Sequence, residues 1–345
     1  MGCYNSFDWK CYVDNYPDLK EAGINDCEQA WNHYQRYGKQ EGRTYNKSSS
    51  NLISKHVVLY KNTDSYLIDF SSVTNYQLNL SNSVKMYSST PCIVAVDDHY
   101  ILIVRYVNYL IKEYDPTFSY SINKEIKLDK SFMKLSEHFH NYSFKNDLLR
   151  HRGIEDIKLF NDSGRLYYIG NVFKFNKSCI ISGVFNGTFK RESILQTTFN
   201  NNTSWEKNWA FVKYRESPCI VYSWFPVKLC EINYSMKNIN LIKEISVPSL
   251  FENVRGSTNG CIFENEIWFV THVNKTGDYY HLFVVFDLDM NFKRYSEYFK
   301  FEDLPVEFCL GLIMEPNRVL LSYSINDRCS KIMIISKLNL TFHTS

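Results

Sequence analysis

Glu155 and Asp156 are adjacent carboxylates that stand directly before an apolar stretch, and Arg152 lies just upstream. Because successive side chains of an extended strand point to opposite faces, we expect these two carboxylates to face opposite sides and Asp156 to share a face with Lys158. One carboxylate can then face a pocket while the other braces the backbone. A surface ion pair at a loop-to-strand junction explains this segment alone equally well.

Similar mixtures of charged, amide and aromatic residues recur further along the chain. They are Arg105, Asn108 and Tyr109; Arg152, Glu155 and Asp156; Glu206, Lys207, Asn208 and Trp209; Arg255, Gly256, Ser257, His272 and His281; and Ser322, Tyr323, Asn326 and Asp327. Each group alone is more often a turn or an edge of a sheet. Five such groups at corresponding places in successive structural units would meet around one axis and form a site.

These residue types suit a polyhydroxylated ligand, since carboxylates and amides accept hydroxyl protons, guanidinium groups donate to oxygens, and aromatic rings stack on sugar faces. A carboxyl group in a shielded channel can also keep its proton near neutral pH and donate it to a glycosidic oxygen. The residues therefore favour a carbohydrate ligand, a sugar phosphate or a sugar nucleotide.

The composition excludes several other classes of protein. The chain has 345 residues, of which 44% are hydrophobic and 16% aromatic, so it can bury one large core and a small appendage. A formal net charge of +2, with basic and acidic residues well mixed, argues against nucleic acid as a partner. Abundant Tyr and Phe beside only 13 Gly favour β-strands.

The N-terminus and the cysteines bear on location. No apolar run is long enough for a transmembrane segment and no secretory signal is visible, so we expect an intracellular, cytoplasmic protein. Gly2 and Ser6 fit an N-myristoylation pattern and Cys3 could carry a second acyl chain, which would tether the protein to a membrane. We expect reduced cysteines within apolar strands, namely Cys179, Cys219, Cys230, Cys261 and Cys309.

The first residues read as a helical module. Phe7 opens one helical pattern, Pro17 suits the first turn of a restart, and a second helix from about Asn25 to Tyr37 is expected to stop at Gly38. The spacing of residues from Phe7-Asp8 to Glu41-Gly42-Arg43 resembles a small helical repeat found beside glycosyltransferases and other surface-polysaccharide proteins. That resemblance implies targeting or docking, and a purely structural cap is equally plausible.

From residue 51 onward, pairs of strand-like runs return with a period of roughly 50 residues, which is typical of propeller blades. Five blades fit this cadence best. We therefore predict a mainly β fold, a five-bladed β-propeller preceded by a small α-helical module. The expected boundaries are 1–46 for the helical module, 47–54 for a linker and 55–345 for the propeller. An extra stretch, about Asp115 to Arg150, is expected to fold over one end of the propeller.

The segment Gly153-Ile154-Glu155-Asp156, together with the blade cadence over about residues 85 to 340, resembles the β-mannoside phosphorylases of glycoside hydrolase family 130 and the related β-mannosyltransferases. The resemblance implies that Asp156 is the general acid and that basic residues bind phosphate or the donor sugar. The nearest basic candidates are Arg105, Arg152, Lys207 and Arg255. This chain has Ile157-Lys158 where the family usually has Pro-Arg, which places the phosphate pocket in doubt.

Other chemistries have weaker signals. The chain has no phosphate-binding Gly-rich loop, no His-Glu-x-x-His and no Cys-x-x-Cys, so we predict no cofactor and no metal. His138, His140 and His151 lie close together in the extra stretch, where we interpret them as part of a solvated loop or a lid rather than as metal ligands.

The sequence thus predicts a carbohydrate-active enzyme that acts on glycosidic bonds by transfer or phosphorolysis, with hydrolysis less favoured. The predicted catalytic residues are Asp156 and Glu155. The predicted substrate-binding residues are Arg105, Asn108, Tyr109, Arg152, Lys207, Asn208, Trp209, Arg255, His272, Tyr323 and Asp327. The alternative is a non-catalytic propeller that binds a glycan or a protein partner.

Overall fold

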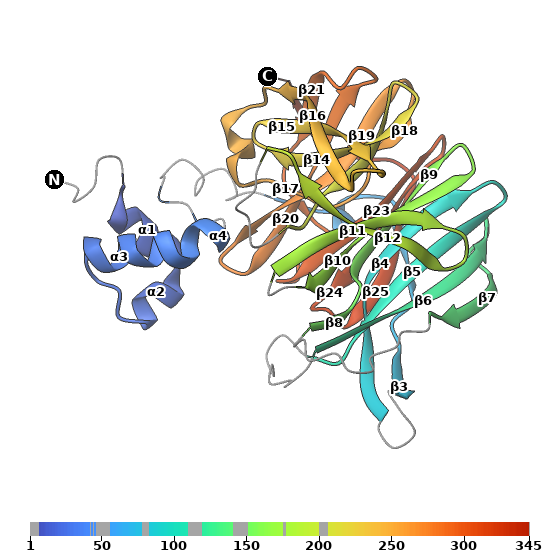
Figure 1. Ribbon diagram of the computed structural model, residues 1–345, viewed down its shortest axis with the longest axis horizontal. Coiled ribbons are helices and arrows are strands. Elements are labelled where there is room, and N and C mark those ends of the chain that lie inside the picture. Colours follow the sequence, from blue (N-terminus) through green and yellow to red (C-terminus); the bar gives the residue numbers. More distant parts are fainter. Residues whose placement is uncertain are drawn as a thin grey trace.

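The computed structural model describes residues 7–41, 43, 45, 56–77, 83–109, 119–140, 151–174, 177–199 and 206–344. Helical elements gather at the N-terminus and form a lobe beside a much larger β region (Figure 1). The predicted linker, together with Gly2 and Cys3, lies outside the described residues. No helix within the described ranges is long and apolar enough to cross a membrane.

The helical module contains α1 (Trp9–Asn15), α2 (Pro17–Glu21), α3 (Cys27–His33), a π-helical turn η1 (Tyr34–Gly38) and α4 (Lys39–Glu41). Side-chain oxygens of Asp8 and Asp26 accept hydrogen bonds from the first turns of α1 and α3, which satisfies backbone donors that a helix start leaves free. A small core of Phe7, Tyr12, Val13, Leu19 and Ala30 joins these short helices. The sequence therefore predicted a helical module correctly.

Gly38 does not stop the last helix, as the sequence analysis predicted, because the helical turns continue to Glu41. This glycine is needed for packing instead. A Cβ at position 38 would lie 2.1 Å from the hydroxyl oxygen of Tyr12, so only glycine leaves room for the buried tyrosine ring.

The described part of the β region consists of strands joined mostly by short polar turns, and it includes the short helices α5 (Leu59–Asn62) and η3 (Ser249–Asn253). The first strands are β1 (Val57–Val58), β2 (Ser65–Asp69), β3 (Val73–Gln77), β4 (Ser83–Val96), β5 (His99–Val107), β6 (Ser119–Asp129), β7 (Lys134–Phe139) and β8 (His151–Gly153). The middle strands are β9 (Glu155–Asp162), β10 (Arg165–Lys174), β11 (Lys177–Phe185), β12 (Phe189–Thr197), β13 (Ala210–Tyr214), β14 (Ser217–Trp224), β15 (Val227–Asn233) and β16 (Asn238–Ile245). The last strands are β17 (Arg255–Gly256), β18 (Cys261–Phe263), β19 (Glu266–Lys275), β20 (Asp278–Asp287), β21 (Phe292–Ser296), β22 (Phe299–Lys300), β23 (Glu307–Glu315), β24 (Arg318–Ile325), β25 (Cys329–Ile335) and β26 (Phe342–Thr344).

These strands pair into antiparallel groups that follow the chain. One sheet has the order β3-β4-β5-β6-β7, with β8 beside β6, and another has the order β13-β14-β15-β16-β12-β11-β10-β9. In the latter, a short parallel pairing of β12 with β16 joins two four-stranded antiparallel groups. A further sheet is built on β19 and β20, and the last has the order β2-β25-β24-β23. Strand β2 thus joins the N-terminal part of the β region to its last strands.

Strands β4, β9, β13, β18 and β23 surround a common axis. Their residues, with Asn259 and Gly260, line one cavity of about 280 Å³. Apolar side chains fill the space between neighbouring sheets, as where Ile101 and Ile103 of β5 pack with Ile157 and Leu159 of β9. The sequence prediction of a mainly β, propeller-like fold after a helical module is confirmed.

The stretch from Asp115 to Arg150 was predicted as a segment folded over one end, and this prediction was wrong for its described part. Residues 119–140 instead form β6 and β7, which extend the first sheet. The register of β5 against β6 shows the reason. Buried Ile122, Ile126 and Leu128 are spaced along β6 as a strand requires, so the segment packs as part of the sheet.

The cysteines Cys179, Cys219, Cys230, Cys261 and Cys309 are free, as predicted. Burial raises the pKa of the Cys219 and Cys261 thiols to about 11, so both stay protonated and pack as small apolar groups. Cys27 of the helical module is the exception among the described cysteines, because it is disulfide-bonded.

Candidate functional site

Arg105 is the centre of a polar cluster at one end of the axis. Its guanidinium donates through Nη1 to Asp156 Oδ1 at 2.9 Å, and its Nη2 lies 3.2 Å from Glu155 Oε1. Nε donates to Ser121 Oγ at 3.0 Å and Nη2 to the Tyr109 hydroxyl at 3.2 Å. The Arg105 side chain is only 5% exposed, so this end of the axis holds a buried cation with two carboxylates.

Electrostatics within the cluster favour the charge on Arg105. Burial opposes that charge, but nearby Tyr109, Glu155, Asp156 and Asp327 outweigh it and raise the pKa of Arg105 well above its ordinary value. The pKa of Tyr109 is also raised, chiefly by burial, so its hydroxyl stays protonated.

A β-bulge positions Asp156. In the ladder between β9 and β10, Glu155 pairs with Asn171 and Lys158 pairs with Ile169, so Asp156 and Ile157 both lie opposite Gly170. Asp156 has φ +49°, a left-handed conformation that costs energy in a non-glycine residue. A Cβ on Gly170 would lie 2.5 Å from Ile154 Cγ2, so this glycine makes room for the bulged strand.

The bulge corrects one sequence prediction. We expected Glu155 and Asp156 to face opposite sides, but both carboxylates contact the same guanidinium group of Arg105. The alternation of a regular strand ends where the extra residue is inserted. Glu155 and Asp156 therefore belong to one site.

A second bulge, in β4, supplies hydroxyl groups to two carboxylates. Ser89 and Thr90 both lie opposite Arg105 in the ladder between β4 and β5. The Thr90 hydroxyl donates to Asp156 Oδ1 at 3.0 Å, and the Ser89 hydroxyl donates to Asp327 Oδ1 at 3.0 Å. Adjacent hydroxyls on one strand thus hold two carboxyl groups that come from different sheets.

Asp327 differs from an ordinary surface aspartate. Burial raises its pKa, and the nearby negative charges of Asp156 and Glu155 raise it further, although Arg105 and the hydrogen bond from Ser89 oppose them. The folded protein therefore favours the protonated form of Asp327 more strongly than the unfolded chain does.

We predict that Asp327→Asn stabilises the fold near neutral pH. Because the pKa of Asp327 is raised in the folded protein, the unfolded chain releases this proton at a lower pH than the folded chain does. Ionisation of Asp327 therefore lowers the free energy of unfolding as the pH rises from about 3.9, the ordinary aspartate pKa, to the higher pKa that Asp327 has in the folded protein. The amide keeps an acceptor for Ser89 without the charge. Urea unfolding at pH 7 and at about pH 3.5 should show a gain in the free energy of unfolding only at the higher pH.

Asp287 provides the matched control for this measurement. Burial opposes its charge, but hydrogen bonds from the Asn291 backbone and side chain lower the pKa of Asp287. Asp287→Asn should therefore lose stability at pH 7 and lose less in acid. A loss of stability at pH 7 in Asp327→Asn as well would overturn the account of Asp327.

Lys158 is buried next to the cluster and does not contact Arg105. The side chain is buried and its Nζ donates to the backbone carbonyl of Trp209 at 2.6 Å. Burial lowers the pKa of Lys158 to about 8, although nearby Asp156 favours the charged form. With Asp156 and Asn208 it lines a cavity of about 10 Å³, which is the size of one water molecule. Lys158 therefore holds the backbone directly before β13.

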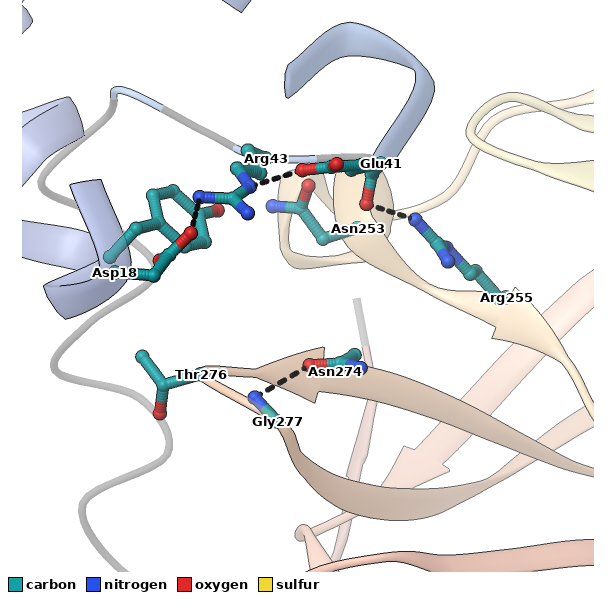
Figure 2. Close-up of a pocket in the computed structure, with 9 residues that line it drawn as sticks. Asp18, Glu41, Arg43, Asn253, Arg255, Asn274, Thr276 and Gly277 are labelled. Carbon is teal, nitrogen blue, oxygen red and sulfur yellow. Dashed lines mark hydrogen bonds and ion pairs between the residues drawn. The ribbon is translucent and has the colours of Figure 1, made fainter. Parts of the chain in front are cut away.

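Two further cations lie near these carboxylates. Desolvation and the neighbouring Arg255 lower the pKa of Lys207, while Asp156 and Glu155 raise it. Arg255 donates through Nη2 to the backbone carbonyl of Glu41 at 2.6 Å, which ties the helical module to β17 (Figure 2). Arg255 thus contacts the module and influences the polar cluster.

A cavity of about 470 Å³ lies between the helical module and the β region. Figure 2 shows Arg43 between Asp18 and Glu41 on one side of it, with Arg255 facing Glu41. Its lining residues are Tyr16, Asp18, Glu41, Arg43, Asn253, Arg255, Asn274, Thr276 and Gly277. The cavity is polar and offers both donors and acceptors.

His272 is buried beside this region, with 2% of its surface exposed. Its Nδ1 lies 2.8 Å from the Ser257 hydroxyl, and its ring stacks on Tyr279 and meets the edge of Phe308. Burial, together with the positive charges nearby, lowers the pKa of His272 well below its ordinary value. His272 is therefore a neutral hydrogen-bonding group near neutral pH.

The structure brings together several of the predicted site residues but not all. Arg105 contacts Tyr109, Glu155 and Asp156 directly, and Asp327 and Lys207 interact electrostatically with the two carboxylates. Arg255 and Lys207 in turn influence His272, which has no such interaction with the carboxylates. Asn208 has φ +66°, and its carbonyl lies only 2.3 Å from where a Cβ of Gly256 would be, so Gly256 permits this close approach.

Four predicted substrate-binding residues make contacts within the protein. Asn108 accepts from the Tyr120 backbone at 2.7 Å, and Arg152 lies over the Tyr120 ring. Trp209 is 1% exposed and packs in the core. Tyr323 is fully buried, stacks on Phe301 and donates to Glu302. The sequence places these residues near strand ends but does not show which way their side chains point.

Sequence reasoning missed Ser89, Thr90 and Ser121, which hold Asp327, Asp156 and Arg105. A signal for the first two was present. Ser88, Ser89 and Thr90 interrupt an apolar strand directly before Pro91, and proline inside a strand marks an edge or a bulge.

Comparisons with solved structures show that the fold is shared with carbohydrate enzymes. A glycosidase from Bacteroides thetaiotaomicron aligns with 78% of this chain and 93% of its own, at 10% identity and a TM-score of 0.57. A glycoside hydrolase from Parabacteroides distasonis aligns over the same shares, at 10% identity and a TM-score of 0.56. The β-1,2-mannobiose phosphorylase from Listeria innocua aligns with 78% of this chain and 96% of its own, at 9% identity and a TM-score of 0.54.

No protein-family model and no curated protein sequence matches the chain. At these identities the likeness establishes the fold alone, and the chain therefore has the propeller-like fold of these proteins.

Proposed function

We propose that this protein is a carbohydrate-active enzyme that acts on glycosidic bonds by glycosyl transfer or phosphorolysis, with Asp156 as the proton donor. One observation carries the proposal. Asp156 is held in a strained bulge by Arg105 and Thr90 through Oδ1, while its Oδ2 makes no hydrogen bond or ion pair with the described residues. An oriented carboxyl group with one free oxygen suits proton transfer.

Arg105 supports the chemistry that we propose for Asp156. In the proposed phosphorolysis, Oδ2 gives its proton to the glycosidic oxygen as the bond from that oxygen to the anomeric carbon breaks, and a phosphate oxygen forms the new bond to that carbon. Asp156 then becomes a carboxylate, and the guanidinium group 2.9 Å from Oδ1 stabilises that charge. Glu155 shares the same guanidinium and takes part as a second carboxylate of the site.

The cations near the site favour transfer or phosphorolysis over hydrolysis. Arg255 lies close enough to Lys207 to lower the pKa of that lysine, and a bound phosphate or sugar nucleotide would offset this repulsion. Lys158 is not proposed to bind the phosphate, because its ammonium group is buried against the Trp209 carbonyl. Asp327 and His272 are proposed to bind sugar hydroxyls.

The substrate that we propose is a β-mannoside, as the resemblance of Gly153-Ile154-Glu155-Asp156 implies and as the name of the Listeria phosphorylase suggests. We also propose that the sheets count as five blades, with the eight-stranded sheet of β9 to β16 contributing two. The five strands around the axial cavity support this division. We further propose that residues 1–46 form a docking module and that the protein is intracellular.

Product analysis by mass spectrometry tests the proposed function. Wild-type protein is incubated with sugar nucleotides, mannose 1-phosphate and β-linked manno-oligosaccharides, each with and without inorganic phosphate. We expect product only when phosphate or a sugar acceptor is present. Product formed equally well in water alone would indicate a glycosidase instead.

A glycan-binding role without catalysis is the second candidate, and the cavity beside the helical module favours it. That cavity presents arginine, amide and hydroxyl groups and a tyrosine, which are the groups that bind sugars without any need for a proton donor. Sugar binding without product, equal in wild type and Asp156→Asn, would support this role.

A further inference from the structure

Three potential metal ligands meet on one face of the first sheet, away from the Arg105 contacts. Glu125 on β6 pairs directly with His138 on β7, so their side chains lie on the same face. His140 follows His138 by two positions, which keeps it on that face, and its backbone N–H donates to the Asn123 carbonyl at 2.9 Å. The antiparallel register therefore brings a carboxylate and two imidazoles together.

Two of these groups are buried and lack hydrogen-bond partners. Glu125 is 2% exposed and His140 is 6% exposed. Glu125 Oε2 and His140 Nε2 have no hydrogen-bond partner in the described structure and no contact with solvent. Burying polar atoms without hydrogen bonds costs free energy. Two such atoms, Glu125 Oε2 and His140 Nε2, lie 3.7 Å apart here, which indicates that a ligand is missing between them.

The atoms are spaced as metal ligands require. Nε2 of His138 and Nε2 of His140 each lie 3.7 Å from Glu125 Oε2, and the three ligand atoms all lie within 4.8 Å of one another. Ligands about 2.0–2.1 Å from a tetrahedral zinc ion lie roughly 3.4 Å apart. A small contraction of the cluster would complete the coordination.

We propose that Glu125, His138 and His140 bind a divalent transition metal, with Zn²⁺ preferred. Two imidazoles and one carboxylate form a common ligand set for zinc, and such a set leaves a fourth position for water. The His138 side chain is 51% exposed, so an ion can enter from solvent on that side. The site is separate from the proposed enzymatic activity and does not depend on it.

A simple ion pair explains the cluster less well. Lys127 Nζ lies 3.9 Å from Glu125 Oε1, so it can balance charge on that oxygen, but it leaves Oε2 facing the imidazoles. Both imidazole Nε2 atoms lie 3.7 Å from Oε2, which is too far for a hydrogen bond but is close to the spacing of two ligands of one metal ion.

The metal would stabilise the contact between two sheets. The His140 ring packs against Phe185 of β11 and Phe189 of β12, with ring centroids 5.9 Å and 4.5 Å away. Coordination would fix this ring to Glu125 of β6 and so join the first sheet to its neighbour. The role that we infer is structural.

The test is metal binding by the full-length protein, free of any affinity tag and stripped with a chelator. Calorimetric titration with ZnCl₂ should show one equivalent bound, and CoCl₂ should give the visible absorption of tetrahedral cobalt. His138→Ala, at an exposed position, should weaken zinc affinity at least about 100-fold without unfolding the protein, and Glu125→Gln should do the same. Zinc should also raise the melting temperature of wild type but not that of His138→Ala.

His343→Ala is the matched control, because His343 is also exposed and lies on β26 outside the cluster. Its zinc affinity should equal that of wild type. The proposal is overturned if wild type binds no stoichiometric zinc, or if His138→Ala and Glu125→Gln bind it as tightly as wild type does.

Discussion

Asp156→Asn is expected to lower turnover by about 10²- to 10⁴-fold while the protein stays folded, because the amide cannot donate the proton that the leaving oxygen needs. Asparagine has nearly the same shape, and its carbonyl oxygen can still accept from Arg105 and Thr90. Substrate binding should therefore change little. Turnover and binding are measured by product formation and by calorimetry on the same preparation.

Asp162→Asn serves as the control for this variant. Asp162 lies on the same strand, at its other end, and forms an ion pair with Lys213 at 3.2 Å. Replacing it should leave turnover within about twofold of wild type, since this ion pair has no contact with Arg105, Glu155 or Asp156. Full activity in Asp156→Asn, or an equal loss in both variants, would remove Asp156 from the role of proton donor.

Arg105→Met is expected to cost about 3–5 kcal/mol of unfolding free energy, because it removes a buried cation and leaves two partly buried carboxylates without their partner. Methionine fills much of the arginine's volume but donates nothing to Glu155, Asp156 or Ser121. Asp327 would then lack the nearby positive charge that now opposes the rise of its pKa. The free energy of unfolding is measured by urea denaturation.

The triple variant Arg105→Met, Glu155→Gln, Asp156→Asn should recover most of this loss, because it removes the carboxylate charges together with the cation. Lys213→Met, at a more exposed ion pair, should change the free energy of unfolding much less than Arg105→Met does. A loss below about 1 kcal/mol in Arg105→Met, or no recovery in the triple variant, would contradict a charge-balanced buried cluster.

The sequence predicted the fold well where the pattern of apolar residues decides it. Paired strand runs with a regular cadence indicated a propeller, and helical spacing around Phe7 and Ala30 indicated the module. The prediction failed at Gly38, where burial of Tyr12 rather than a helix stop explains the glycine. It also failed for β6 and β7, because a strand rich in charged residues resembles a loop when it is read without its partners.

The sequence predicted the residues of the candidate site in part, but not how their side chains are oriented. Arg105, Glu155 and Asp156 were recognised by residue type, and the structure places them in contact. Their relative orientation could not be predicted, because a one-residue bulge turns the Asp156 side chain to the same side of the strand as Glu155. Tyr323 and Trp209 have suitable chemistry but point into the core, which only the packing of neighbouring sheets decides.

The measurement that tests the central claim most directly is product formation from β-mannosides and sugar nucleotides, with wild type and Asp156→Asn compared in the same reactions. Our account predicts a product from wild type that depends on phosphate or an acceptor sugar, and almost none from the variant. Equal product from both proteins, or sugar binding by both without any product, would contradict the proposal that Asp156 is the proton donor of an enzyme.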